Sequence, residues 1–149
     1  QAARLRDHFF ETDQSFVTET VFSHHSKNDL ITQAQNSGFK VILNHVQVDD
    51  SHKAFLRVKR RVLLGGHPVP EKKVHERFPR TIENLKKAVK QADLSYIWDN
   101  NQGLNPDQVS HRFVMMMNKG VIKKLSSNVP EWAKEMYREQ INNFKKKRS

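Results

Sequence analysis

The segment FKVILNHVQVDDSHKAFLRVKRRVLL, residues 39–64, joins a strand pattern to a helix pattern. Residues 39–48 form a nearly continuous apolar run, which is typical of a strand covered on both faces of a sheet. Asp50 or Ser51 can then cap a helix over residues 52–64. A buried strand followed directly by a capped helix is the building unit of α/β proteins, so this segment predicts that class.

Strand and helix patterns also alternate on either side of this segment. Strands rich in β-branched and aromatic residues, and helices with recognisable starts and stops, are predicted in turn. This alternation predicts a single α/β domain over residues 1–149 with a mainly parallel sheet. The further predicted elements are a strand at 15–22 (SFVTETVF), a helix at 26–37 ended by Gly38, helices at 71–76 and 79–92, and a strand at 94–100 (LSYIWDN).

The C-terminal third has a different pattern. Residues 111–125 (HRFVMMMNKGVIKKL) predict a β-hairpin with its turn at Asn118-Lys119-Gly120. Pro130 then opens a terminal helix. The residues expected along the apolar face of that helix are Trp132, Met136, Tyr137 and Ile141.

Composition and charge narrow the classes of function. The net charge of +10 predicts an anionic partner, either nucleic acid or a phosphorylated small molecule. There is no cysteine, which excludes disulfides, thiolate catalysis and cysteine zinc sites and fits a reducing cytoplasm. No apolar run approaches the roughly 20 residues that cross a bilayer. We therefore expect a cytoplasmic protein without a membrane partner.

Most of the excess charge lies in one segment. Residues 53–90 contain twelve Lys or Arg against three acids, on two predicted helices joined by the connector GGHPVP, 65–70. Arginine offers paired donors that match phosphate oxygens, so this arm suits closing over a phosphate group. It also suits a nucleic-acid surface, although only Phe55 and Phe78 supply aromatic rings there, fewer than stacking surfaces for bases usually have. Both interpretations remain open on the residues alone.

Three of these segments together resemble a known family. SFVTETVFS, then RVKRRVLLGGHPVPEKKVHERFPRTIENL (57–85), then AD followed by a strand ending in DN, are similar to the zeta-toxin-like P-loop kinases over roughly residues 2–101. The resemblance implies a three-layer fold with a central parallel sheet and a helical, Arg-rich lid at about residues 53–80. It also implies a phosphotransferase that uses ATP and Mg²⁺ to phosphorylate a hydroxyl of a small molecule, with an antitoxin protein as a partner.

The resemblance also assigns roles to particular residues. Arg77 and Arg80 match the lid arginines that neutralise charge on the transferring phosphate. Glu19 matches the acidic residue at the end of the strand that lines the substrate pocket. The rest of the expected substrate site is Thr20, Ser23 and His24. Toxins that act on a nucleotide sugar have a Gly-Thr-x-Arg type sequence after this Glu, and the different sequence here argues against that substrate.

The expected nucleotide contacts lie near the ends of the later elements. Asp99 and Asn100 occupy the position where kinases of this shape contact nucleotide, and Arg61 is the expected cofactor contact from the arm. No metal site is predicted, because His24 and His25 have no third ligand at a suitable spacing.

The chain has no GxxxxGK[ST] phosphate loop. In the resembled family this loop and the general base precede the region that matches here, so we expect the first strand and the phosphate loop to lie upstream of Gln1. In the strand order 2-3-1-4-5 of such kinases, the strands at 15–21 and 39–48 would then be separated by the width of one strand. The sequence thus predicts an ATP-dependent phosphotransferase. The alternative is a nucleic-acid-binding module that uses residues 53–90.

Overall fold

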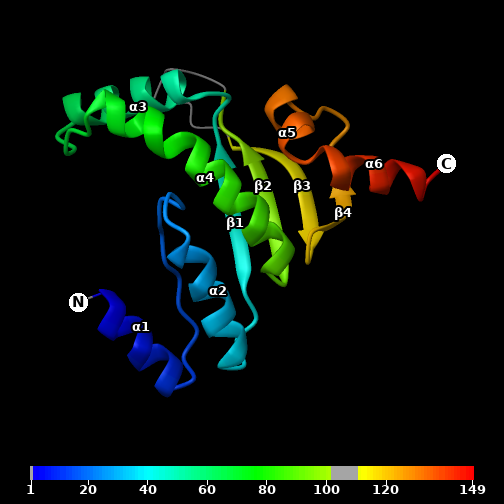
Figure 1. The fold of residues 1–149 in the computed structure, drawn as a ribbon, viewed down its shortest axis with the longest axis horizontal. Coiled ribbons are helices and arrows are strands. Elements are labelled where there is room, and N and C mark those ends of the chain that lie inside the picture. Colours follow the sequence, from blue (N-terminus) through cyan, green and yellow to red (C-terminus); the bar gives the residue numbers. More distant parts are fainter. Residues whose placement is uncertain (1, 102–110) are drawn as a thin grey trace.

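The computed structural model describes residues 2–101 and 111–149, which form six helices and four strands (Figure 1). In chain order the elements are α1 Ala2–Glu11, α2 Ser26–Asn36, β1 Ile42–Gln47, α3 Ser51–Leu63, α4 Glu71–Gln91, β2 Leu94–Asp99, β3 Arg112–Asn118, β4 Val121–Leu125, α5 Glu131–Met136 and α6 Arg138–Lys146. The α/β class expected from the alternation is confirmed.

The four strands form one sheet in the order β1-β2-β3-β4. β1 and β2 are parallel, in a register that runs from Ile42 opposite Leu94 to Gln47 opposite Asp99. β3 pairs antiparallel with both β2 and β4, so the sheet is mixed, and the expectation of a mainly parallel sheet is corrected. The predicted β3–β4 hairpin is confirmed: Lys119 and Gly120 both have positive φ (46° and 78°), the turn geometry that keeps two antiparallel strands adjacent.

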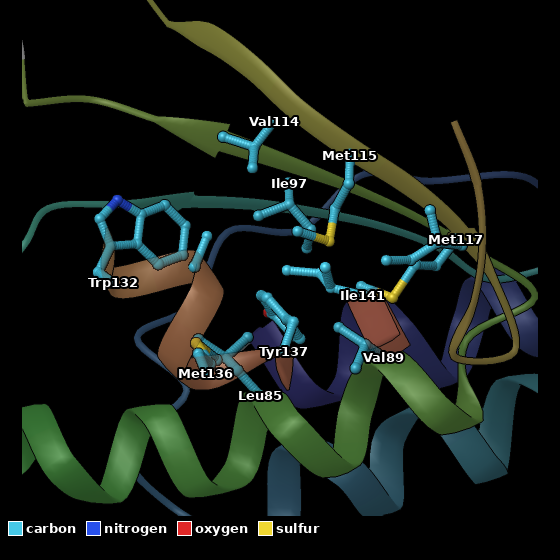
Figure 2. Close-up of a cluster of buried hydrophobic side chains, with 12 residues drawn as sticks. Leu85, Val89, Ile97, Val114, Met115, Met117, Trp132, Met136, Tyr137 and Ile141 are labelled. Carbon is cyan, nitrogen blue, oxygen red and sulfur yellow. The ribbon is translucent and has the colours of Figure 1, made fainter. Parts of the chain in front are cut away.

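The hydrophobic core lies on one face of the sheet (Figure 2). Ile97, Met115 and Met117 point from the strands toward Val89 of α4 and Tyr137 beside α5, and all five side chains are 0% exposed. The opposite face of β1 is open among the described residues, with Ile42 54% and Val46 44% exposed. The expectation that this strand is covered on both faces is therefore wrong.

The predicted basic arm is a helical hairpin that extends past the sheet (Figure 1). α3 begins at the expected cap, since the Lys53 amide donates to the Asp50 carboxylate at 2.8 Å. It ends at Leu63, and Gly65 just beyond it has φ of +91°, which lets the Gly66 amide reach back to the Arg61 carbonyl at 2.9 Å.

The two helices predicted at 71–76 and 79–92 are instead the single helix α4, with Pro79 inside it. Pro79 has no N–H to donate to the His75 carbonyl, an interruption that typically costs about 3 kcal/mol. Burial of Leu85, Ala88 and Val89 on one side of the same helix offsets this cost.

The strand predicted at 15–22 is absent, and residues 14–23 form an irregular segment between α1 and α2. Its β-branched residues are not buried, since Val17 is 97% and Val21 65% exposed. A strand requires a neighbour for its backbone N–H and C=O groups, and this segment is not paired with β1 or with any other described strand. Strand propensity without a partner therefore gave the wrong prediction here.

The remaining predictions agree with the structure at the level of whole elements. α2 ends before Gly38, which has φ of +87°. The terminal helix begins after Pro130 but is divided into α5 and α6 at Tyr137. The four residues expected on its apolar face are all buried. Among the described residues, no helix is both long and apolar enough to cross a membrane.

Candidate functional site at the carboxyl end of the parallel strands

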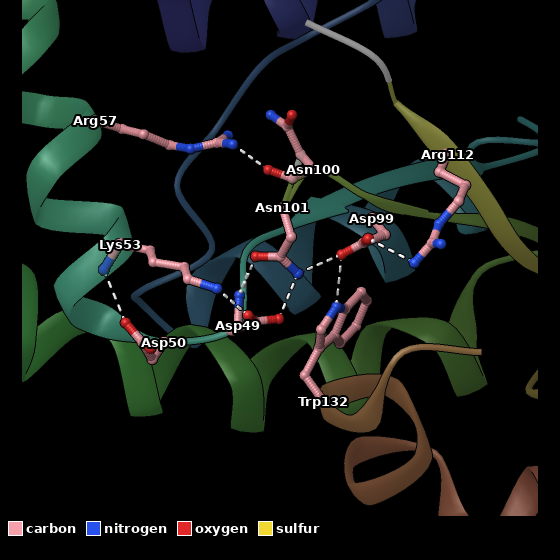
Figure 3. Close-up of polar contacts among 9 residues, drawn as sticks. All are labelled: Asp49, Asp50, Lys53, Arg57, Asp99, Asn100, Asn101, Arg112 and Trp132. Carbon is pink, nitrogen blue, oxygen red and sulfur yellow. Dashed lines mark hydrogen bonds and ion pairs between the residues drawn. The ribbon is translucent and has the colours of Figure 1, made fainter. Parts of the chain in front are cut away.

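Asp99, the last residue of β2, is the centre of a polar cluster at the carboxyl end of the parallel pair (Figure 3). Its side chain is 2% exposed. One carboxylate oxygen accepts the Trp132 indole N–H of α5 at 2.9 Å and a hydrogen bond from Asn101, and the other accepts from Arg112 of β3 at 3.0 Å. A buried carboxylate needs such donors, because burying an unpaired charge is costly. Asp99 is therefore held by residues from three parts of the chain.

Asn101 connects this carboxylate to the end of β1. Its side-chain oxygen accepts the Asp49 amide at 2.9 Å, and its NH₂ group donates to the carboxylates of both Asp49 and Asp99. Asn100 supports the same link, since its backbone N–H donates to the Gln47 carbonyl at 2.9 Å. The ends of β1 and β2 are thus joined by side chains as well as by the sheet.

The first two turns of α3 attach to this cluster. Lys53 forms an ion pair with Asp49, and Arg57 donates to the Asn100 carbonyl. The hydrogen bond from Lys53 to Asp49 raises the lysine pKa, whereas partial burial lowers the pKa of Arg57. Both groups are cationic at neutral pH. The base of the basic arm is therefore fastened to the carboxyl edge of the sheet, where open α/β sheets place ligands.

The residues at this edge do not by themselves fit ATP and Mg²⁺. Asp99 is almost completely buried and both its oxygens already accept hydrogen bonds. Within residues 2–101 and 111–149, no three His, Asp or Glu side chains lie close enough together to hold a metal ion. The 149 residues also contain no phosphate loop. We therefore assign no chemical step at this edge to either group.

Of the three residues predicted to bind the cofactor, two belong to this cluster and one does not. Asp99 and Asn100 lie together at the end of β2. Arg61 is exposed and lies in the last turn of α3, whereas the contacts to the cluster come from the first two turns of that helix. The assignment of these residues to a nucleotide stays a prediction.

The predicted catalytic residues lie in the first half of α4, and the segment that carries the predicted substrate residues contacts the second half of the same helix. Arg77 and Arg80 are exposed on that helix, where Arg80 donates to the Glu76 carbonyl at 3.1 Å. Glu19, Thr20, Ser23 and His24 lie in or just after the irregular segment 14–23, which reaches α4 where Asn84 donates to the Phe22 carbonyl at 2.8 Å. Within the described residues, no hydrogen bond or ion pair joins either arginine to the four predicted substrate residues. Their roles also stay predictions.

Lys53, Arg57, Arg112 and Trp132 are among the members of the cluster that were not predicted from the sequence as site residues. Arg112 is opposite Asp99 in the antiparallel register, a relation that appears only when the strands are aligned. Trp132 was expected only as part of an apolar helix face. The spacing of Lys53 and Arg57, four residues apart on a capped helix, was a usable signal, because such residues share one helix face.

A second polar pair, His45 and Tyr137, is buried between the sheet and the end of α5. Nδ1 of His45 on β1 is hydrogen-bonded to the Tyr137 hydroxyl at 3.1 Å, and the two side chains are 6% and 0% exposed. Burial lowers the pKa of His45 to about 4 and raises the pKa of Tyr137. Both groups are therefore neutral at pH 7.

Comparison with known proteins identifies the family. The family model described as "Zeta toxin" matches residues 1–105, which is more than half of the chain. The match covers α1 to β2, including the basic arm, and ends before β3. No protein of curated function and no solved structure matches the sequence. On the strength of the family match, the chain belongs to the zeta toxin family.

Proposed function

We propose that this protein is an ATP-dependent phosphotransferase of the zeta toxin type, which phosphorylates a hydroxyl group of a small molecule. The observation that carries the proposal is the family match over residues 1–105, the part of the chain that contains both the basic arm and the carboxyl edge of the parallel strands. ATP and Mg²⁺ enter the proposal through the family alone.

The arm is suited to the phosphate group. Arg77 and Arg80 are exposed and are not held by an acidic side chain in the described residues, so their guanidinium groups are available to an anion. Forked Arg donors placed where negative charge develops stabilise a transition state more than a ground state. In this proposal the two arginines neutralise the negative charge on the phosphoryl oxygens.

The acceptor is assigned to the irregular segment 14–23. Glu19 and Thr20 are exposed there, and the carboxylate of Glu19 can accept a hydrogen bond from an alcohol or sugar hydroxyl. Because this segment is attached to α4 through Phe22 and Asn84, the acceptor residues and the arginines are carried by connected elements. A small hydroxyl compound is the proposed substrate class. A nucleotide sugar is one member of that class, to be included in the assay.

The test measures phosphate transfer by the natural full-length protein. ATP labelled at the γ-phosphate is incubated with a panel of sugars, nucleotide sugars and other alcohols, and labelled product is separated from ATP and phosphate. Arg77→Ala and Arg80→Ala should each lower kcat strongly, by up to about 10³-fold, with little change in ATP affinity. Lys87→Ala removes an exposed cation from another part of α4 and should leave kcat unchanged.

Two outcomes would count against the proposal. Absence of labelled product with every acceptor would remove the phosphotransferase assignment, and unchanged kcat in both arginine variants would remove their role. Nucleic-acid binding by residues 53–90 is the alternative, and a salt series separates it. Affinity for nucleic acid should fall steeply as the salt concentration rises, because binding releases counterions. The rate of phosphate transfer need not fall in the same way.

A further inference from the structure

We propose that Trp132 and Arg112, which lie beyond the family match, are positioning residues that hold the base of the basic arm through Asp99. The family match ends at residue 105, whereas Arg112 begins β3 and Trp132 belongs to α5. The inference rests on the proposed function in one respect, since it takes the α3–α4 hairpin to be the part that approaches the phosphate. Its structural content can be tested without that assumption.

The buried carboxylate of Asp99 depends on the hydrogen bonds from Trp132 and Arg112. Its carboxylate is 2% exposed, so water cannot replace a lost donor without local opening. The Trp132 indole is 7% exposed and its single N–H points at Asp99 at 2.9 Å. The Arg112 side chain is two-thirds buried, and its Nε has no hydrogen-bond partner among the described residues. Within the described residues, the bond to Asp99 is the polar contact that orients this guanidinium.

Asp99 in turn orients Asn101. The NH₂ group of Asn101 donates to Asp99, which turns the side-chain oxygen toward the Asp49 amide at 2.9 Å. Without Asp99 as a fixed acceptor, the Asn101 side chain keeps only its hydrogen bonds to Asp49 among the described residues, and its orientation is less strongly fixed. Asp99 thus acts on Asp49 through Asn101 (Figure 3).

Asp49 lies in the short connection between β1 and α3. β1 ends at Gln47 and α3 begins at Ser51, so residues 48–50 join this strand to the first helix of the arm, while the second helix, α4, leads into β2. Asp49 also pairs with Lys53, and Arg57 binds the Asn100 carbonyl. These contacts, together with the packing of α3 against α4, set the direction in which α3 leaves the sheet. A substitution of Trp132 should therefore weaken the contacts at the base of α3, although the two are far apart in the sequence.

The matched pair of variants is Trp132→Phe and Trp98→Phe in the natural full-length protein. Both remove one indole N–H and keep an aromatic ring. Trp98 precedes Asp99 on β2, but its side chain lies on the opposite face of the strand and donates to Asn44 at 3.3 Å rather than to Asp99. Hydrogen exchange with single-residue fragmentation is read at Asp49 and across residues 51–57. Trp132→Phe should speed exchange there by about tenfold, the effect expected for losing a hydrogen bond to a buried charge, and Trp98→Phe should not.

A double-mutant cycle separates positioning from a general loss of packing. Asn101→Ala cuts the connection between Asp99 and Asp49 at a partly exposed site that the core does not use. In the Asn101→Ala background, Trp132→Phe should not further increase the exchange rate at residues 51–57, because the hydrogen bonds from Asp99 through Asn101 to Asp49 are already lost. An additive effect, or an equal response to Trp98→Phe, would overturn the proposal.

The kinetic readout then connects the positioning role to the proposed function. Trp132→Phe should lower kcat for phosphate transfer by about tenfold with little change in ATP affinity, since a displaced arm affects the transition state more than binding. If the protein transfers no phosphate at all, the proposed function fails, while the exchange data still decide whether Trp132 positions the arm. If transfer occurs and Trp132→Phe leaves both kcat and exchange unchanged, the positioning role alone is refuted.

Discussion

Acidification from pH 7 to pH 5 should destabilise this protein through one buried side chain, His45. Its pKa is about 4 in the folded state against 6.5 in the unfolded chain, because burial disfavours the charged ring. Between these two values the unfolded state binds more protons than the folded state. The contribution of His45 is therefore fully present above pH 6.5 and is lost as the pH falls toward 4.

The magnitude follows from the difference between the two pKa values. At 1.36 kcal/mol per unit the complete loss is about 3 kcal/mol, and about 2 kcal/mol of it falls between pH 7 and pH 5. The structure supports the full effect, since His45 is 6% exposed and its neighbours, the Tyr137 hydroxyl and the Trp132 ring, carry no charge to offset the imidazolium. This loss is large relative to the typical net stability of a domain.

The assay is urea unfolding at pH 7 and pH 5, comparing the wild type with His45→Asn. The Asn side chain does not titrate, and its amide can either donate to or accept from the Tyr137 hydroxyl. His45→Asn should lose about 2 kcal/mol less than the wild type on acidification. His52→Asn, at an exposed position on α3, is the control and should behave as the wild type does. The same pH dependence in the wild type and in His45→Asn would show that His45 does not cause the loss of stability.

Two further predictions concern the ends of α3. Asp50→Ala removes the carboxylate that accepts the Lys53 amide and should lower stability by about 1 kcal/mol, measured by urea unfolding. Asp50→Asn should recover most of that loss, and equal stability of all three proteins would show that the cap contributes nothing. Gly65→Ala places a side chain at φ of +91° and should cost about 1 kcal/mol or more. Gly65→Asn should cost less, because Asn tolerates positive φ, so equal losses for Ala and Asn would contradict this account.

Local patterns predicted most elements of the fold. The alternation of apolar and capping residues placed α2, β1, α3, β2 and the β3–β4 hairpin, and each forms within a few residues of its predicted bounds. These elements depend on interactions between residues close in the chain, such as the Asp50 cap and the Lys119-Gly120 turn. Such interactions can be read from sequence without knowing the neighbours in space.

The incorrect predictions concern features that depend on contacts between residues distant in the chain. The segment 15–22 has strand propensity but no paired strand, and α4 continues through Pro79 because the rest of the helix is packed against the core. His45 could have been assigned to the buried face from alternation alone, since Leu43, His45 and Gln47 are the less exposed side chains of β1. Its Tyr137 partner, 92 residues away, could not.

The α/β class, the position of the basic arm and the family resemblance could be predicted from the chain alone, because these depend on composition, periodicity and short motifs. The burial of Asp99 under Trp132 and Arg112, and its connection to Asp49 through Asn101, exist only in the folded protein. The physical reason is that a hydrogen bond between residues distant in the chain depends on strand register and helix packing. These are settled by the fold as a whole, and no local pattern encodes them.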